Sequence, residues 1–302
     1  MTPAVLGLHI GGSKTHALKA ASGADTAAGE GVELTEDSAN LASLGHQRAD
    51  AVLRRIAAEL GDGVQAVYAG AAGADTPANR AVLAALLTEH FPGARIDVVH
   101  DTRIILAASG LQSGAVLVAG TGSVAWGLTP DGREARAGGY GYLLGDEGGG
   151  YSVVRDAVRE TLREYYAGLE PGPLAQALLS ATTSADPLQL MDLYYRKPEP
   201  RYWAGLSSLV FELAAAGDRE AAHIVADAAY ALAALARQVH GSLGTELPLI
   251  LAGGLLLKHP ELAAAVARKL EPEDPGKVRL LERAPVHGAV ELARRGLAQA
   301  GA

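Results

Sequence analysis

The chain has 302 residues, of which 49% are apolar, only 5% are aromatic and 20% are charged, with a formal net charge of −8. It contains no cysteine, which excludes disulfides, cysteine-bound zinc, iron–sulfur clusters and thiol nucleophiles. No basic stripe indicates nucleic-acid binding, no basic leader precedes the first apolar stretch, and no apolar run is long enough to span a membrane. We therefore expect an α/β protein in the cytoplasm, with neither a nucleic-acid nor a membrane partner.

The first half of the chain alternates strand and helix patterns, which predicts a sheet with parallel segments. Two strands are joined by a turn at Gly11–Gly12, and helices alternate with further strands after them. The predicted strands lie at 5–10, 16–20, 64–71 and 96–100, and the predicted helices at 41–60, from Pro77 to about His90 and from about Arg103.

The second half opens with the same plan as the first. GAVLVAGTGSVAWGL (114–128) is again an apolar strand, a glycine and hydroxyl turn and a second strand. We therefore expect two similarly built lobes whose loops face each other across a cleft. The rest is predicted to be mostly helical from 150 to about 243, followed by a strand at 247–254, a helix at 260–270, a short strand at 278–281 and a last helix from about 287.

GGSKT at 11–15 is one residue away from a Walker A loop, because Ser13 separates Gly12 from Lys14. A Walker loop also opens a helix, whereas HALKA continues as a strand. The Walker interpretation therefore fails. The turn is either a nest of backbone N–H groups and hydroxyls for phosphate oxygens or a plain glycine hairpin. GTGS at 120–123 is a second such turn, and a nucleotide triphosphate could be held between the two.

Asp101 ends a buried strand and precedes a helix, which is where α/β folds meet their ligands. A carboxylate there could accept the proton of an attacking hydroxyl as a general base. A helix N-cap is the alternative role that this position allows.

GGYGYLLGDEGGGY at 138–151 is the densest motif, with seven glycines around Asp146 and Glu147. Glycines let the backbone approach a ligand closely, and adjacent carboxylates can hold sugar hydroxyls or a hydrated cation. An acidic helix start would explain the acids but not the glycines. LILAGG at 249–254 could form part of an adenosine pocket, or the two glycines could serve tight strand–helix packing.

These motifs, in this order and closing with APVHGA at 284–289, resemble the N-acetylglucosamine kinase and BadF/BadG/BcrA/BcrD ATPase family of the actin, hexokinase and heat-shock-protein superfamily. The resemblance covers nearly the whole chain. It implies two ribonuclease-H-like lobes (1–108 plus 286–302, and 109–285 with a helical insertion) that close on substrate, with ATP and Mg²⁺ as cofactors. It also implies a homodimer.

The resemblance assigns roles residue by residue. The family's catalytic base matches Asp101, and its sugar contacts match Asn40, Gly138, Gly139 and Asp146. The nucleotide-binding positions match Gly11, Gly12, Ser13, Lys14, Thr15, Gly120, Thr121, Gly122, Ser123, Gly253 and Gly254. AGAAGAD at 69–75 also fits the family pattern. The implied activity is ATP-dependent phosphorylation of a hydroxyl, expected to be the 6-hydroxyl, of N-acetylglucosamine or a related amino sugar.

Two positions depart from the family. Its first loop begins with Asp or Glu, which helps to hold Mg²⁺, whereas this chain has His9 followed by Ile10, so the metal ligands are unknown. A polar sugar contact often follows the second turn, where this chain has Val124. The alternative function is therefore a sugar- or nucleotide-binding protein of the same fold with weakened or lost catalysis. The iron–sulfur activators in the family are excluded, since the chain has no cysteine.

Overall fold

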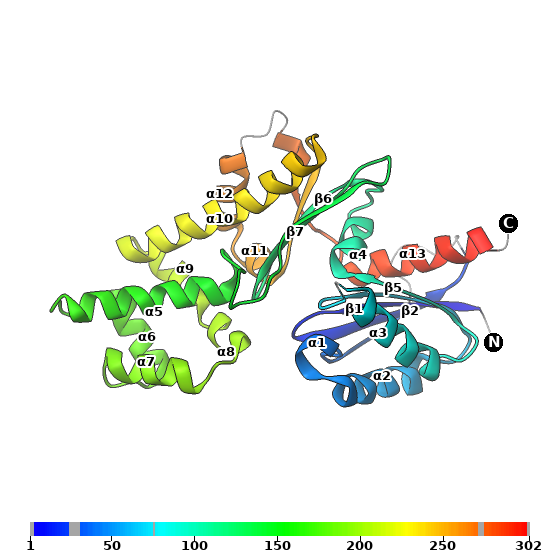
Figure 1. Ribbon diagram of the computed structural model, residues 1–302, viewed down its shortest axis with the longest axis horizontal. Coiled ribbons are helices and arrows are strands. Elements are labelled where there is room, and N and C mark those ends of the chain that lie inside the picture. Colours follow the sequence, from blue (N-terminus) through cyan, green and yellow to red (C-terminus); the bar gives the residue numbers. More distant parts are fainter. Residues whose placement is uncertain (1–2, 24–30, 75, 271–274, 301–302) are drawn as a thin grey trace. The chain divides into compact units, whose positions relative to one another are not determined.

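The computed structural model describes residues 3–23, 31–74, 76–270 and 275–300 (Figure 1). The chain divides into two compact units. Unit 1 comprises Met1–Gln112 and Leu281–Ala302, and unit 2 comprises Ser113–Leu280. Of the AGAAGAD stretch, residues 69–74 lie within the described ranges and Asp75 lies outside them.

Unit 1 is built on a five-stranded mixed sheet in the order β3-β2-β1-β4-β5. β1 (Ala4–Ile10), β2 (Lys14–Ala21) and β3 (Val32–Asp37) are antiparallel neighbours, whereas β4 (Val64–Ala71) and β5 (Arg95–His100) run parallel to β1. Ile10 pairs with Ala71, which pairs with His100, so the segments after all three parallel strands begin at one level of one sheet edge.

Helices cover both faces of this sheet. Leu6, Leu8 and Ile10 of β1 join a core with α2 (His46–Leu60) and α3 (Pro77–His90). Val5 of β1 lies in a second core with α13 (Pro285–Ala300), which packs on α4 (Asp101–Ala108). Gly7 allows this approach, because a Cβ there would come within 2.7 Å of the Val286 carbonyl oxygen.

Three details of unit 1 differ from the sequence predictions. The helix expected over 41–60 is two helices, α1 (Leu41–Leu44) and α2, because Gly45 between them takes a left-handed φ of 77°. The edge strand β3 was not predicted. α4 starts at Asp101 rather than near Arg103.

Unit 2 repeats the plan with a sheet in the order β10-β9-β6-β7-β8. β6 (Gly114–Ala119), β7 (Ser123–Leu128) and β8 (Glu134–Gly138) form an antiparallel meander, and β9 (Leu249–Ala252) and β10 (Val278–Leu280) run parallel to β6. β8 was not predicted, and the strand expected over 247–254 is only four residues long. The two mixed sheets confirm the predicted ribonuclease-H-like fold class.

The helical part of unit 2 packs on its sheet around one core that includes Leu117, Val154, Trp203 and Leu232. Proline occupies the start of several of these helices, where its missing N–H costs no hydrogen bond. The helices are α5 (Gly150–Tyr166), α6 (Pro173–Thr182), α7 (Pro187–Arg196), α8 (Pro200–Ala204), α9 (Ser207–Ala215), α10 (Arg219–Leu243), α11 (Gly254–Lys258) and α12 (Pro260–Leu270). None of the helices in the described residues is both long and apolar enough to cross a bilayer.

Candidate functional site

The turn between β1 and β2 is a tight hairpin, closed by a 2.9 Å hydrogen bond from the Gly11 N–H to the Lys14 carbonyl. Gly12 is exposed, and a Cβ added there would meet nothing within 4 Å. The following residues continue as β2 and open no helix, as expected for a turn that is not a Walker loop. An open turn of this kind leaves backbone groups accessible at the sheet edge.

The hydroxyl residues beside this turn tie it to the segment that follows β3. Thr15 is fully buried, and its Oγ1 accepts a 2.9 Å hydrogen bond from the Ala39 N–H. Ser38 donates from its Oγ to the Gly11 carbonyl at 2.6 Å. Thr15 therefore holds the loop that carries Asn40, and its contact with a phosphate stays a prediction.

Asn40 is buried and caps the short helix α1. Its Oδ1 accepts hydrogen bonds from the backbone N–H groups of Ala42, at 2.9 Å, and Ser43, at 3.3 Å. A Cβ on Gly73, which has a φ of 81°, would come within 2.7 Å of that Oδ1. The cap uses the Oδ1 of Asn40, and the contact of Asn40 with a sugar hydroxyl stays a prediction.

Asp101 is the first residue of α4 and directly follows β5. The N-cap alternative for Asp101 is wrong, because His100 occupies the cap position. A carboxylate in the first helical turn is favoured by the positive end of the helix dipole. The register of β1, β4 and β5 puts Asp101 at the same sheet edge and the same level as Gly11.

His9, which replaces the family's carboxylate, pairs across the hairpin with His16. A Cβ on Gly11 would lie 4.0 Å from the Nε2 of His9, so the imidazole lies alongside the turn. Burial, with smaller effects from His16 and Lys14, lowers the pKa of His9 to about 4. The side chain is therefore neutral at physiological pH and supplies no charge to this site.

The turn between β6 and β7 lies against the start of α5. Gly150 and Tyr151 donate their backbone N–H groups to the carbonyls of Gly120 and Thr121, at 2.8 and 3.0 Å. Ser123 is buried, and its Oγ donates to the Glu147 carbonyl at 2.7 Å. The GTGS turn and the GDEGGG segment therefore form one structural piece of unit 2.

Asp146 lies directly on this turn. Its Oδ1 accepts a 3.2 Å hydrogen bond from the Ser123 N–H, and its carboxylate occupies the space that a Cβ on Gly122 would need. Burial raises the pKa of Asp146, opposed by the Ser123 hydrogen bond. Asp146 is also one of two non-glycine residues with positive φ among the described residues, at 65°. The Asp146 carboxylate lies against the proposed phosphate turn. Its contact with sugar stays a prediction.

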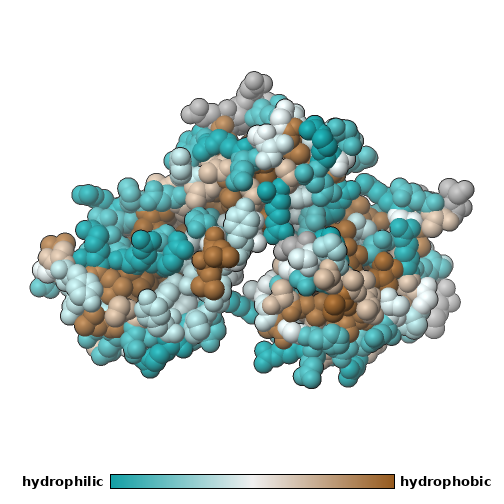
Figure 2. All heavy atoms as spheres, viewed as in Figure 1, coloured by the Kyte–Doolittle hydropathy of each residue, from teal (hydrophilic) through white to brown (hydrophobic). Residues whose placement is uncertain are grey.

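Gly138 ends β8 and Gly139 follows it, with left-handed φ angles of 73° and 69°. The Gly139 N–H donates to the Ser123 carbonyl at 2.9 Å, which joins these glycines to the same turn. In the loop that follows, Leu143 and Leu144 are 78% and 82% exposed. Figure 2 shows strongly apolar surface where this loop meets the start of α5.

Gly253 and Gly254 follow β9 at the edge where Gly120 follows β6. The register pairs Val118 with Ala252, which brings the two turns side by side. Gly253 has a φ of 94°, and a Cβ there would overlap the carbonyl of Ala119. Close packing therefore requires this glycine, and its contact with adenosine stays a prediction.

A model of the BadF/BadG/BcrA/BcrD ATPase family matches residues 6–293 of this chain. The chain belongs to that family. The family assigned from the motifs is therefore confirmed, and ATP is the nucleotide that the family's description names.

Two curated relatives of this family member are sugar kinases. An N-acetyl-D-glucosamine kinase of Dictyostelium discoideum is 29% identical over 297 residues, covering 89% of this chain and 91% of the relative. An N-acetylmuramic acid/N-acetylglucosamine kinase of Clostridium acetobutylicum is 30% identical over 170 residues, which cover 53% of this chain and 54% of the relative.

A solved structure from Chromobacterium violaceum, described as a candidate N-acetylglucosamine kinase, is also similar to this family member. The likeness has a TM-score of 0.74 with 25% identity, and it covers 97% of this chain and 99% of that one. The similarity therefore extends over both units.

Mg²⁺ stays a prediction, and the acid beside each turn is of the ligand type that this ion prefers. In unit 1 the acid is Asp101, whereas neutral His9 supplies no carboxylate oxygen. In unit 2 the acid is Asp146. Within the described ranges no three His, Asp or Glu side chains are grouped as a metal cage.

Sequence reasoning missed Ser38 and Gly73, which position the first turn and Asn40. Ser38 stands two residues before Asn40 in the DSAN segment, but its bond to Gly11 depends on the pairing of the undetected β3 with β2. Gly73 lies in the recognised AGAAGAD stretch, and its role becomes clear only from its approach to the Asn40 cap.

Proposed function

We propose that this chain is an ATP-dependent kinase that phosphorylates a hydroxyl, the 6-hydroxyl, of N-acetylglucosamine or a related amino sugar. Membership of an ATPase family and the likeness to the Dictyostelium kinase over 89% of this chain support the proposal. The likeness to the Clostridium kinase supports N-acetylglucosamine and N-acetylmuramic acid as the acceptors to test first.

The observation that carries the proposal is the position of Asp101. Strand register brings this carboxylate to the same level as the open glycine turn of unit 1 and to the same sheet edge. A carboxylate beside a phosphate-binding turn can accept a hydroxyl proton while the oxygen attacks phosphorus.

In the proposed reaction, Asp101 takes the proton of the C6 hydroxyl as that oxygen bonds to the γ-phosphorus. The bond from the γ-phosphorus to the β–γ bridging oxygen breaks, and ADP leaves with the bond's electron pair. In unit 1, backbone N–H groups of the first glycine turn hold phosphate and Asn40 orients the sugar. In unit 2, N–H groups of the second turn hold phosphate, and Gly138, Gly139 and Asp146 contact the sugar. When bound, Mg²⁺ neutralises phosphate charge.

A second candidate function follows from His9. The imidazole beside the first turn is neutral, because burial lowers its pKa to about 4. A chain without charge at that position could bind sugar or nucleotide and transfer phosphate slowly or not at all. Sugar binding without any turnover would support this binding-protein alternative.

The first experiment is a coupled ADP-release assay with Mg²⁺ and four acceptors: N-acetylglucosamine, N-acetylmuramic acid, glucosamine and glucose. We expect turnover with an N-acetylated sugar. Asp101→Asn should lower kcat by roughly 10²–10⁴-fold, the usual contribution of a general base, with little change in sugar affinity.

Asp97→Asn is the matched control, because Asp97 lies on the same strand and pairs with Arg95 at 2.8 Å. Equal losses in both variants would contradict a catalytic role for Asp101. Absence of a phosphorylated product with every sugar would contradict the kinase proposal. The homodimer and the cytoplasmic setting stay predictions from the sequence.

A further inference from the structure

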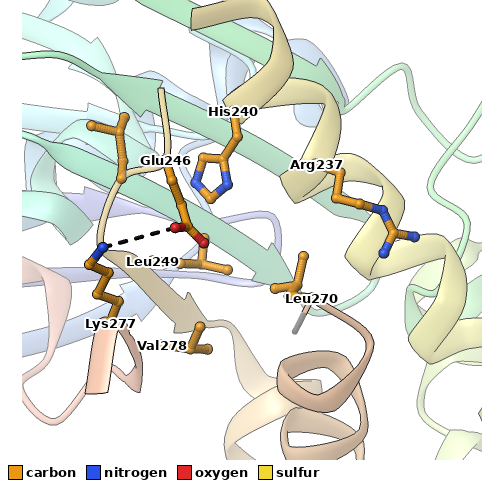
Figure 3. Close-up of a pocket in the computed structure, with 8 residues that line it drawn as sticks. Arg237, His240, Glu246, Leu249, Leu270, Lys277 and Val278 are labelled. Carbon is orange, nitrogen blue, oxygen red and sulfur yellow. Dashed lines mark ion pairs between the residues drawn. The ribbon is translucent and has the colours of Figure 1, made fainter. Parts of the chain in front are cut away.

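Unit 2 contains a cavity of about 210 Å³ whose walls come from α10, the segment before β9, the end of α12 and the start of β10. Figure 3 shows its polar side chains: Arg237 and His240 on α10, Glu246, and Lys277. Leu249, Leu270 and Val278 supply much of its apolar wall. The proposed kinase reaction uses none of these side chains.

The cavity lies away from the glycine turns of the same unit. Leu249 and Val278 are the first residues of the parallel strands β9 and β10, and they pair with each other. The Gly253–Gly254 turn follows the other end of β9, about 13 Å away at the usual rise of a strand. A ligand in this cavity would therefore occupy a site separate from the nucleotide-binding turns.

His240 lines this cavity and carries an unsatisfied group. Its Nε2 atom is buried and has no hydrogen-bond partner among the described residues. A buried imidazole nitrogen without a partner costs free energy that a ligand atom can recover. Burial lowers the pKa of His240, partly opposed by Glu246, so the neutral ring can donate one hydrogen bond.

The charges around His240 favour an anion. Arg237 and Lys277 are cationic, although the Arg237 guanidinium already donates to the Lys269 carbonyl at 2.8 Å. Glu246 is the one anionic side chain among the described residues that line the cavity. The Lys277 ammonium is 3.9 Å from the Glu246 carboxylate, beyond hydrogen-bond distance. Lys277 therefore has donors to offer to a second acceptor.

We propose that this cavity binds a small aliphatic carboxylate. One carboxylate oxygen accepts from the Lys277 ammonium and the other from the Nε2–H of His240, while the alkyl group packs on Leu249, Leu270 and Val278. A buried water needs only about 10–15 Å³ of such space, so the cavity has room for a ligand of several non-hydrogen atoms. The five-carbon acid 3-methylbutanoate is a probe of that size.

The test uses the full chain with ¹³C-labelled histidine, in which the imidazole signal of His240 is assigned by its loss in His240→Gln. Sodium 3-methylbutanoate is titrated at constant pH and ionic strength, and neutral 3-methylbutanamide is titrated in parallel. We expect a saturable shift of the His240 signal with the carboxylate and binding at least about tenfold weaker with the amide, because charge-assisted hydrogen bonds are the stronger ones. The exposed His223 should not respond.

Lys277→Gln should weaken carboxylate binding by about tenfold. Lys258→Gln is the matched control, because it removes the same charge from an exposed residue of unit 2 that does not line the cavity. The proposal is overturned if the wild-type signal shows no saturable shift below about 50 mM, a very weak affinity. Equal affinity for amide and carboxylate, or unchanged affinity in Lys277→Gln, would also overturn it. The outcome does not depend on whether the chain is a kinase.

Discussion

The turn after β1 in unit 1 and the turn after β6 in unit 2 both join antiparallel strands, yet their surroundings differ. Gly12 in the first turn is exposed, and an added Cβ would meet nothing within 4 Å. Gly122 in the second turn lies beneath Asp146, and a Cβ there would overlap its carboxylate. The first turn has a neutral histidine beside it, whereas the second has a partly buried acid.

The two turns contain glycine for different reasons. Packing explains Gly122, because a Cβ there would overlap the Asp146 carboxylate. Packing does not explain Gly12, and phosphate binding at this turn stays a prediction. The two turns therefore make opposite predictions about stability and activity.

Among changes at the two turns, the largest expected effect comes from placing a carboxylate beside the first turn. His9→Asp should raise kcat by about 10²–10³-fold, or about 3–4 kcal/mol of barrier, which is typical of one well-placed electrostatic group. The physical reason is that a carboxylate oxygen suits Mg²⁺ and a neutral imidazole does not. The ADP-release assay measures the change.

His9→Asn is the matched control, since it is polar and neutral and should bring no gain. If the two variants have equal rates, charge at position 9 is irrelevant to the reaction, and the contrast between the turns loses its functional meaning.

The second effect is on stability and depends on pH. The pKa of His9 is about 4 in the folded chain, against 6.5 for a histidine side chain free in water, so only the unfolded chain takes up this proton between those values. The folding stability that neutral His9 contributes is fully present above pH 6.5. It is lost as the pH falls toward 4, and the loss is roughly 3 kcal/mol. Urea unfolding at about pH 7 and about pH 4.5 measures the loss.

His9→Asn should remove most of that loss. The matched control is His223→Gln, which changes a side chain that is 75% exposed and should keep the full pH dependence. An unchanged pH dependence in His9→Asn would mean that the imidazole is solvated in the folded chain.

The strands and turns that carry these residues could largely be predicted from sequence. β4 and α3 occupy the predicted positions, because an apolar run and a proline start signal mark them locally. β3 could not be recognised, because it is a mostly exposed edge strand whose VELTED sequence carries three acids. The break at Gly45 was hidden by apolar periodicity that continues across it.

The candidate site was predictable as a set of motifs but not as a set of contacts. The bond between Ser38 and Gly11 and the overlap of Asp146 with Gly122 join residues more than twenty positions apart. Such pairs depend on strand register and loop path, which local patterns do not encode. From the sequence alone, Asp101 could be either a general base or a helix N-cap. The helix boundary at His100 excludes the N-cap role, and the role as a base stays a prediction.

The third effect compares the glycines directly. Gly122→Ala should lower the free energy of unfolding by about 1–3 kcal/mol, because the new methyl group displaces Asp146 in a packed segment. Gly12→Ala should change it by less than about 0.5 kcal/mol, as for other exposed positions without such contacts. Urea unfolding of both variants gives the comparison.

The same pair tests the ligand argument. Gly12→Ala should weaken ATP binding although the fold is intact, since its methyl group stands where a phosphate is expected to approach. Normal ATP affinity in a stable Gly12→Ala variant would contradict phosphate binding at the first turn.

The smallest effect concerns Asp146, whose folded pKa is raised above 3.8 mainly by burial. The folded chain therefore holds this proton more tightly than the unfolded chain. The resulting stability is fully present below pH 3.8 and is lost as the pH rises through the folded pKa. Asp146→Asn keeps an oxygen for the Ser123 N–H and removes the buried charge. At neutral pH it should change the free energy of unfolding by less than about 1 kcal/mol, toward greater stability.

Glu147→Gln, which removes a neighbouring but exposed charge, should keep most of the pH dependence, because burial is the larger cause at Asp146. Paired measurements of unfolding and kcat then separate the two roles of this acid. A variant Asp146→Asn that is as stable as the wild type but catalytically impaired would show that the charge serves the reaction. Loss of stability together with activity would mean that Asp146 only supports the structure of the second turn. The two turns would then differ in structure, and this difference would have no consequence for the reaction.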